Sequence, residues 1–487
     1  MDPYFPIIYV RGYAMRRQDI ADTVATPYMG FNLGATKVRQ DWRGGVVRHV
    51  FESPLIRLMK EHGYRDVYQD GAEISGPVAA KSVVIYRYYD AADPDFGDGW
   101  RLSILEAAHG LKALIHQLRE QVCGDDRQKR AAFRVHLVAH SMGGLVCRAF
   151  LQNDAVGSAA DRALVDKVFT YATPHNGIEL AGMNVPGGLG LWHMNNFNRG
   201  RMADYLGLPE GWERVDSLNG RFPPERFFCL VGTNHRDYGA ARIAAGEMSD
   251  GLVRIANATV KGAPRAFVHR SHSGPYGIVN SESGYQNLVR FLFGDLCVTG
   301  SLECACLPLP PSIRRAREKG RRVRASYYFE ATVAPRGAFM FKLNARRVET
   351  ESAVLRRFDE LFASAGTPLQ RPRSPILFSA FLDSSKITAG RSLVFSIDLA
   401  VSTTGYTVDG TMSTRRHIPG EYLFRNTVTV RATPGETGWV LRYAMADDQW
   451  GESRGRTAER DGEDWLIPLR SAKGFSGRLR LKPRARA

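Results

Sequence analysis

The stretch "RVHLVAHSMGGLVCRAF" (residues 134–150) joins an apolar run to a segment with the pattern of an amphipathic helix. The apolar run is typical of a strand buried on both faces. Ser141 follows it, with the small residues Ala139 and Gly143 two positions to either side. A strand, a serine and a helix in this order predict a nucleophile elbow, in which a sharp turn exposes the serine hydroxyl and crowds the backbone around it. Ser141 is therefore the candidate nucleophile, and amides at the start of the helix, beginning with that of Met142, are candidate oxyanion donors.

Length and composition define the class of protein. The chain has 487 residues, of which 44% are hydrophobic, so we expect two or three folded domains. It has no run of about 18 apolar residues, and the start "MDPYFPIIYV" lacks the basic and apolar regions of a signal peptide. These features predict a cytoplasmic protein by default, with export by a route that needs no such signal as the alternative.

The formal net charge is +16, and basic residues concentrate at 314–324 ("RRAREKGRRVR") and 470–487. Such charge attracts anionic surfaces, although solvated segments are the ordinary explanation of a charge run. We expect peripheral contact with an anionic membrane surface rather than with nucleic acid. The sequence does not define an oligomeric state.

The six cysteines are expected to be mostly reduced thiols in a chain of this length without a signal peptide. Cys297, Cys304 and Cys306 cluster, but no fourth ligand of metal spacing stands nearby in the sequence. No metal site and no cofactor are therefore expected.

The chain has two regions with different hydrophobic patterns. Up to residue 296, apolar strand-like runs at 6–10, 82–89, 134–140, 167–173, 226–233 and 265–270 alternate with helix-like stretches such as 104–122 and 283–294. This alternation predicts an α/β domain with a mostly parallel sheet over residues 1–296. Residues 297–325 are rich in Pro and Arg and predict a linker. Residues 326–487 show near-alternating apolar residues, which predict a mainly β, sandwich-like domain of unknown role, interrupted by one helix at 351–366.

A serine nucleophile needs a base and an orienting acid, and both candidates lie downstream in the order Ser, Asp, His. Asp250 lies in "MSDGLVRIANA", on a loop after the strand at 226–233, with Asp216 and Asp237 as weaker alternatives. His272 lies in "HRSHSGPYG", past the end of the next strand, whereas His269 falls within the strand-like run. Loops after the carboxyl ends of strands form the sites of open α/β sheets.

The second half of the oxyanion hole is expected in the loop after the first strand, "YVRGYAMRR". Gly12 allows a close approach of the backbone, and the Tyr13 amide is the candidate donor. His140, directly before the nucleophile, is interpreted as a packing histidine rather than a proton carrier.

The first 296 residues resemble the lipase and esterase branch of the α/β-hydrolase superfamily. "AHSMGG" resembles the elbow of bacterial lipases, and "ATPHNG" (172–177) resembles a segment of lipases and their relatives, including deacylases of glycosylphosphatidylinositol lipids. "SDGLV" and "SHSG" resemble the acid and base loops. The resemblance implies Ser141 as nucleophile, Asp250 as acid and His272 as base. The chain departs from lipases in having Arg11 where they usually have His before the glycine.

The resemblance implies a serine hydrolase of carboxylic acyl esters, of lipids above all, acting through an acyl-enzyme. The segment at 178–208, rich in Met, Trp, Phe and Gly, fits a lid or an acyl-binding wall. An acyltransferase or a thioesterase would use the same triad, and a non-catalytic binding protein on a hydrolase scaffold is a further alternative. The β domain is a candidate for membrane binding, partner docking or stabilisation.

Overall fold

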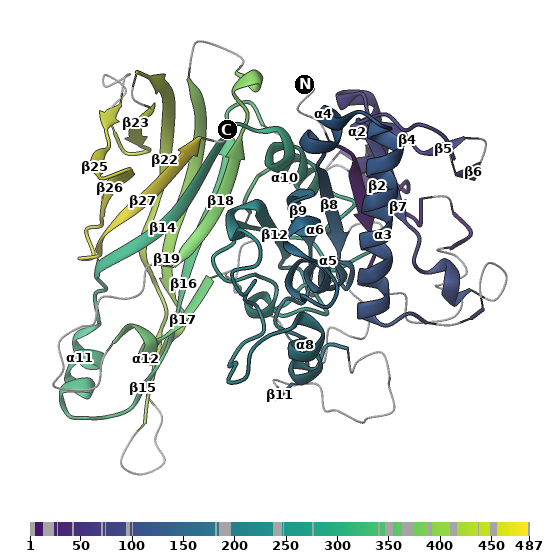
Figure 1. The fold of residues 1–487 in the computed structure, drawn as a ribbon. Coiled ribbons are helices and arrows are strands. Elements are labelled where there is room, and N and C mark those ends of the chain that lie inside the picture. The colour runs from purple at the N-terminus through teal and green to yellow at the C-terminus, as the bar shows by residue number, and fades with distance from the viewer. Residues whose placement is uncertain are drawn as a thin grey trace. The chain divides into compact units, whose positions relative to one another are not determined.

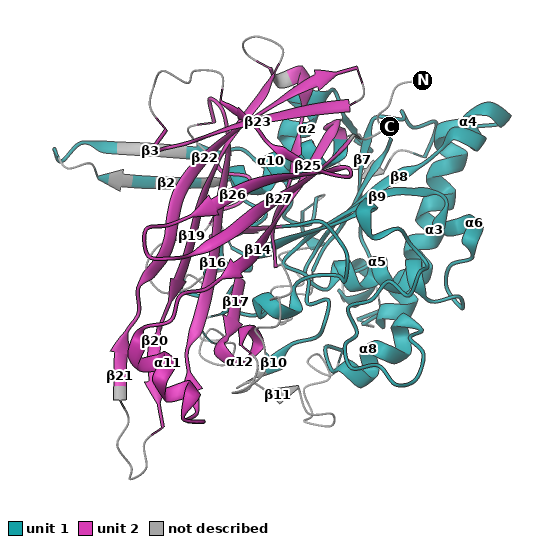
Figure 2. Cartoon of the chain, turned by 90° about the vertical axis from the view of Figure 1, so that its left-hand side faces the viewer, with its two compact units in different colours: residues 1–265, 270–292 teal, residues 266–269, 293–487 magenta. Residues whose placement is uncertain are grey.

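A computed structural model of the chain gives its fold (Figure 1). It describes residues 5–12, 24–26, 28–40, 43–69, 72–73, 75–93, 98–99, 101–180, 183–184, 196–236, 246, 248–274, 277–338, 341–345, 354–362, 375–387, 392–409, 416–436, 438–448 and 455–485. The chain forms two compact units, shown in Figure 2. Unit 1 comprises Met1–Arg265 and Arg270–Leu292, and unit 2 comprises Ala266–His269 and Phe293–Ala487.

The centre of unit 1 is formed by six strands of a seven-stranded sheet, and three of the four residues of the seventh, β13 (Arg265–Val268), are assigned to unit 2. In spatial order the strands of this sheet are β13, β12 (Phe227–Gly232), β9 (Val165–Tyr171), β8 (Val135–His140), β1 (Ile7–Val10), β7 (Ser82–Tyr86) and β4 (Arg65–Asp66). β1 pairs in parallel with both β7 and β8, and its four residues are fully buried. Strands buried on both faces need apolar side chains throughout, which explains the continuous runs in the sequence. The predicted α/β fold with a parallel sheet is confirmed.

Helices cover both faces of this sheet. They are α2 (Pro54–His62), α3 (Ile104–Cys123), α4 (Arg127–Ala132), α5 (Gly143–Gln152), α6 (Ala159–Arg162), α8 (Arg199–Leu206) and α10 (Glu282–Phe293), with 3-10 turns η1 (Asp90–Ala92), η2 (Pro224–Arg226) and η3 (Ile255–Asn257). In Figure 2, α2 and α10 lie on one side of the sheet, and α3 to α6 lie on the other. The Arg57 guanidinium of α2 lies 3.7 Å from the centre of the Tyr285 ring of α10, which holds the first pair together.

Local sequence signals set the helix boundaries. Ser103 and Glu106 form a reciprocal capping box at the start of α3, which satisfies two amides that the helix leaves without partners. The α2 helix begins after Ser53, whose hydroxyl accepts from the Ile56 amide, and it ends at Gly63 in a left-handed conformation.

Three two-stranded hairpins complete unit 1. They are β2 (Ala35–Gln40) with β3 (Val46–Phe51), β5 (Tyr68–Gln69) with β6 (Ala72–Glu73), and β10 (Glu179–Leu180) with β11 (Met183–Asn184). The first of these is the longest and pairs over six residues on each strand.

Unit 2 is built from antiparallel strands, as the alternating sequence pattern predicts. One sheet has the order β18 (Ile376–Leu382), β14 (Leu296–Cys306), β27 (Ser476–Ala485), β26 (Asp464–Arg470) and β25 (Glu459–Asp461). A second has the order β17 (Val354–Arg357), β16 (Ser326–Pro335), β19 (Leu393–Thr403), β22 (Tyr422–Gly435), β23 (Gly438–Met445) and β24 (Arg456–Thr457). A third comprises β15 (Val323–Arg324), β20 (Gly405–Val408) and β21 (Arg416–Pro419), and the helical turns are α11 (Pro311–Glu318), α12 (Phe358–Leu361) and η4 (Ser384–Lys386).

The structure differs from the sequence prediction at two places in unit 2. Residues 297–325, expected as a linker, contain most of β14, which pairs with both β18 and β27, and the helix α11. The alternating "LCVTGSLECAC" has the period of a strand, and a strand with neighbours on both sides belongs to the sheet rather than to a linker. At 351–366, in place of one long helix, the structure has β17 followed by the single turn α12, and residues 351–353 and 363–366 lie outside the described part.

None of the helices in the part of the chain that the structure describes combines the length and the apolar character needed to cross a membrane.

Candidate active site

Ser141 lies in a strained turn between β8 and α5. Its φ of 52° is in the left-handed region, which costs a residue with a side chain about 1–3 kcal/mol. The turn is held from both sides, because the Ser141 amide donates to the Tyr171 carbonyl at 2.9 Å and the Thr173 hydroxyl donates to the Ser141 carbonyl at 2.8 Å. The predicted elbow geometry is therefore present, with Met142 as the residue that caps α5.

The small residues around Ser141 are required by close backbone contacts. A Cβ atom on Gly143 would lie 2.2 Å from the Val10 carbonyl oxygen, and one on Gly144 would lie 2.3 Å from the Thr173 hydroxyl. A Cβ atom on Gly12 would lie 2.6 Å from that of Ser141. The glycine after the first strand thus lies directly against the candidate nucleophile, where the oxyanion loop was expected.

The structure brings Ser141, His272 and Asp250 into one chain of hydrogen bonds. The His272 Nε2 atom lies 3.0 Å from Ser141 Oγ, and its Nδ1 atom lies 2.9 Å from Asp250 Oδ2. All three are buried, with Ser141 6%, His272 3% and Asp250 1% exposed. An imidazole in this position can accept the serine proton on one nitrogen while the carboxylate orients the other.

Backbone contacts fix the acid in its loop. The second carboxylate oxygen of Asp250 accepts from the amides of Leu252 at 3.0 Å and Val253 at 2.8 Å. The Asp250 carbonyl accepts from the His272 amide at 2.9 Å, so the acid and base loops are joined through main chain as well as side chains. These contacts restrain the direction in which the carboxylate faces His272.

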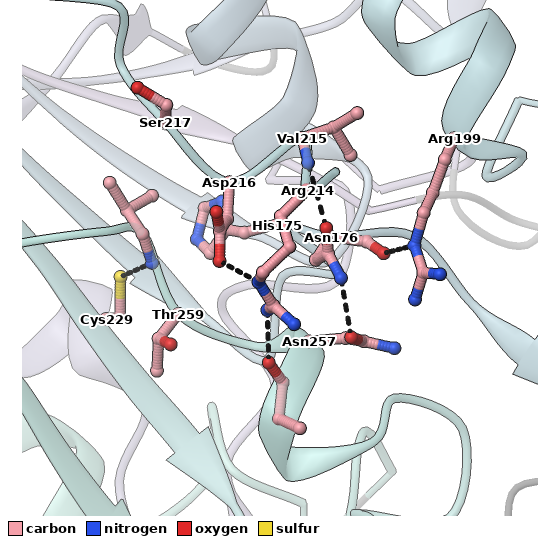
Figure 3. A network of polar contacts seen from close by, with 12 residues as sticks. His175, Asn176, Arg199, Arg214, Val215, Asp216, Ser217, Cys229, Asn257 and Thr259 are labelled. Carbon is pink, nitrogen blue, oxygen red and sulfur yellow. Dashed lines mark hydrogen bonds and ion pairs between the residues drawn. The ribbon is translucent and has the colours of Figure 1, made fainter. Parts of the chain in front are cut away.

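The alternative residues lie elsewhere. Asp216 pairs with Arg214, whose Nε lies 2.8 Å from its carboxylate, in the network that Figure 3 shows. Asp237 is outside the described residues. His269 directly follows the end of β13, whereas His272 is the histidine within hydrogen-bonding distance of Ser141.

The network in Figure 3 ties the "ATPHNG" segment to the loop that follows Asp250. The Asn176 side-chain nitrogen, Nδ2, donates to Asn257 Oδ1 at 2.9 Å, and the Asn176 side-chain oxygen accepts from the Val215 backbone amide at 2.9 Å. The backbone amide of Asn176 donates to the Asn257 carbonyl, also at 2.9 Å. One asparagine thus joins three loops at the carboxyl edge of the sheet.

His140 contacts the backbone of the candidate base, His272. Its Nε2 atom lies 2.9 Å from the His272 carbonyl oxygen, which makes it a donor there. Burial above all, followed by repulsion from the His272 ring, lowers the pKa of His140 to about 3. His140 is thus neutral, and its protonated nitrogen donates to a backbone carbonyl. This agrees with its interpretation as a packing histidine rather than a proton carrier.

Two tyrosines that the sequence analysis did not single out hold the loop after β1. The Tyr88 hydroxyl donates to the Arg11 carbonyl at 2.7 Å, and the Tyr89 hydroxyl donates to the Gly12 carbonyl at 2.9 Å. Tyr13 itself lies outside the described residues. Its amide shares a planar peptide group with the Gly12 carbonyl, so a bond that holds this carbonyl restrains the orientation of that group.

Arg148 is a second residue that the sequence analysis missed. It lies on α5 and is fully buried, and it donates to the carbonyl oxygens of His175, Val215 and Ser217 at 2.6–2.9 Å and to the Gln152 side chain at 2.7 Å. Burial lowers the pKa of Arg148 to about 10, which still leaves it charged at neutral pH. It therefore connects the nucleophile helix to the loops after β9.

Arg11 occupies the position where lipases usually have His. Its guanidinium donates to the Met29 carbonyl, which links the loop after β1 to the segment that leads into the β2–β3 hairpin. The predicted lid segment, residues 178–208, is described only at 178–180, 183–184 and 196–208, so its centre lies outside the described part.

Among the residues that the structure describes, no three His, Cys, Asp or Glu side chains are grouped to hold a metal ion. The six cysteines all lie in the described part and form no disulfide with one another, and Cys306 is exposed while the others are buried. The arrangement around Ser141 is thus an acid, a base and a hydroxyl on three loops at one edge of a parallel sheet.

Comparison with known proteins gives a match over part of unit 1. Among the solved structures that are similar to the chain are a gene product of Listeria innocua (14% identity, 59% of this chain and 94% of that one, TM-score 0.29) and the phospholipase PlaB of Legionella pneumophila (13% identity, 81% of this chain and 86% of that one, TM-score 0.34). Similarity at this level identifies no activity. No curated protein sequence matches the chain. Residues 102–182, which include β8, Ser141 and α5, match the family model described as PGAP1-like alpha/beta domain, and unit 1 has the fold of an α/β-hydrolase.

Proposed function

We propose that the protein is a serine hydrolase that cleaves carboxylic acyl esters, most of all those of lipids, through an acyl-enzyme. The observation that carries this proposal is the continuous chain of hydrogen bonds from Asp250 through His272 to Ser141, on a serine held at positive φ. A serine that only forms a turn does not require a strained backbone, nor a buried imidazole and carboxylate in line with its hydroxyl.

In the proposed reaction, Ser141 Oγ attacks the ester carbonyl while His272 Nε2 takes its proton. The tetrahedral oxyanion is stabilised by the amide of Met142, at the start of α5, and by the amide after Gly12. The imidazolium, stabilised by Asp250, gives its proton to the leaving alcohol, and the acyl group stays on Ser141. Water then attacks the acyl-enzyme, with His272 as base again, and releases the acid and the free serine.

An acyltransferase or a thioesterase differs only in the acceptor or in the leaving group, so the same residues support either as an alternative. A screen of the purified protein against soluble short-chain esters, long-chain glycerides, phospholipids and acyl thioesters, with products identified by mass spectrometry, tests the proposal. We expect free fatty acid from oxygen esters, with Ser141→Ala inactive. Turnover of thioesters alone, or transfer to an added alcohol without free acid, would favour the alternatives, and no turnover of any acyl substrate would contradict the proposal.

A further inference from the structure

The β2–β3 hairpin exposes apolar side chains that the rest of unit 1 does not cover. Val38, Val46 and Val50 are 57%, 71% and 72% exposed, and Leu33, just before the hairpin, is 57% exposed. Large aliphatic side chains with so much exposed surface are costly in water when they gather on one element. Figure 2 shows the hairpin extending away from the sheet of unit 1.

The three valines share one face of the hairpin. In its antiparallel register, Thr36 is opposite Val50, Val38 is opposite Arg48, and Gln40 is opposite Val46. Residues directly opposite one another, and residues two apart on a strand, point to the same side of a sheet. The positions of Val38, Val46 and Val50, here named the valine face, therefore lie on one side of the hairpin, together with those of Thr36, Gln40 and Arg48.

The segment that leads into the hairpin is anchored in the core, in contrast to the exposed valines. Met29 and Phe31 are buried before β2, and the Phe31 ring lies edge-on at 4.9 Å from Tyr9 of β1. A Cβ atom on Gly34 would lie 2.2 Å from the Phe51 carbonyl oxygen, so the two strands close tightly at their base. The exposure of the valine face is thus not the fraying of a loosely attached segment.

The charge of the hairpin selects the kind of partner. Residues 35–51 contain four Lys or Arg residues and one acid. By the same register, the position of Arg48 shares the valine face, whereas those of Lys37 and Arg39 fall on the opposite face. A hairpin with one apolar face and a surplus of basic residues suits a bilayer that presents acyl chains beneath anionic headgroups.

We propose that the valine face docks on the surface of an anionic phospholipid bilayer, an inference that rests on the proposed activity toward lipid esters. The hairpin leads from the segment whose Met29 carbonyl accepts from Arg11, and Arg11 directly precedes Gly12, which lies against Ser141. The hairpin is thus joined through the segment before it to the loop that carries Gly12.

Vesicle binding tests the proposal. The full-length protein is mixed with vesicles of phosphatidylcholine alone or with phosphatidylglycerol, and bound protein is measured by co-sedimentation. Thr has the β-branched shape of Val and keeps the strand, so Val38→Thr, Val46→Thr and Val50→Thr are made singly and together. We expect the unsubstituted protein to bind the phosphatidylglycerol vesicles. Each substitution exchanges one methyl group that docking buries in the bilayer for a hydroxyl, so the binding constant should fall by about fourfold for each single variant and by about 60-fold for the triple variant.

Val440→Thr is the matched control, because Val440 is 41% exposed on β23 of unit 2 and lies outside the hairpin. It should bind vesicles like the unsubstituted protein. Equal binding by the triple variant and the unsubstituted protein would overturn the proposal, as would no binding to any vesicle. If the triple substitution instead dissociates a dimer in light scattering and leaves vesicle binding unchanged, the valine face is an interface between copies of the chain and the lipid proposal is wrong.

A soluble short-chain ester separates this inference from the proposed function. We expect the triple variant to hydrolyse it with a kcat/KM within twofold of the unsubstituted protein, since the valine face is not part of the hydrogen-bonded site. Vesicle binding without any ester hydrolysis would overturn the proposed function and leave the docking surface standing. Ester hydrolysis together with vesicle binding that does not depend on the valines would support the proposed function and overturn the docking surface.

Discussion

Replacing Tyr89 with Phe removes one hydroxyl from beneath the candidate oxyanion loop and leaves the ring in place. The substitution removes the 2.9 Å hydrogen bond to the Gly12 carbonyl, which is buried, and the contact of this hydroxyl with Tyr88. A bond of this kind contributes about 0.5–1.5 kcal/mol net. If all of this is felt as loss of the productive orientation of the peptide group after Gly12, kcat falls by up to about tenfold. Removal of a whole oxyanion donor, on the order of 10²–10³ in kcat, sets the upper limit.

Tyr86→Phe is the matched control on the same segment of chain. Its hydroxyl donates at 2.8 Å to the Ala107 carbonyl within α3, so the substitution removes the same kind of bond from a helix that carries no candidate site residue. Both variants should lose about 1 kcal/mol of unfolding free energy in urea titrations. Only Tyr89→Phe should lower kcat on a soluble ester, with KM unchanged within twofold. Equal effects of the two substitutions on kcat, or no effect of Tyr89→Phe, would refute the reasoning.

Three further outcomes are expected. Asp250→Asn keeps the shape of the acid but no longer favours the tautomer of His272 that accepts the serine proton, so kcat should fall by on the order of 10⁴ in steady-state assays, and retention of a tenth of the activity would speak against the assignment. Arg148→Met leaves several buried carbonyls without a donor and should lower the unfolding free energy by about 3–5 kcal/mol in urea titrations, whereas a loss below about 1 kcal/mol would show that water replaces the guanidinium. The pKa of His140 is lowered in the folded state, to about 3, so the unfolded chain binds the extra proton between pH 3 and its ordinary pKa near 6.5, and stability should fall as pH decreases through this window. In His140→Gln the melting temperature should depend less on pH between about pH 3 and 6.5. An unchanged slope of melting temperature against pH would show that other groups cause the loss of stability in acid.

The sequence was sufficient for the features that depend on local pattern. Continuous apolar runs such as "PIIYV" and "RVHLVAH" occur where a strand is covered on both faces, and this pattern correctly predicted the parallel sheet. The order Ser, Asp, His along the chain, with each residue after a strand, was enough to select Ser141, Asp250 and His272, which the structure brings within hydrogen-bonding distance.

Features that depend on which strands are neighbours were not predictable in the same way. Tyr88 and Tyr89 reach Arg11 and Gly12 because β7 pairs beside β1, and the sequence alone does not reveal that pairing. Strand order was the missing signal, since residues that follow two neighbouring parallel strands meet at one edge of the sheet. Segment 297–325 was misleading for another reason, because its Pro and Arg content is typical of a linker while its first part, residues 297–306, has the alternation of a strand.

The most direct test of the central claim is to label the folded protein with a fluorophosphonate and to locate the adduct by mass spectrometry. The reagent phosphonylates a serine only where a base and an oxyanion hole activate it. We expect a single adduct on Ser141, none on Ser141→Ala, and labelling slowed by orders of magnitude in His272→Ala. An adduct on another residue, or no adduct on protein shown to be folded, would contradict the claim that Ser141 is an activated nucleophile.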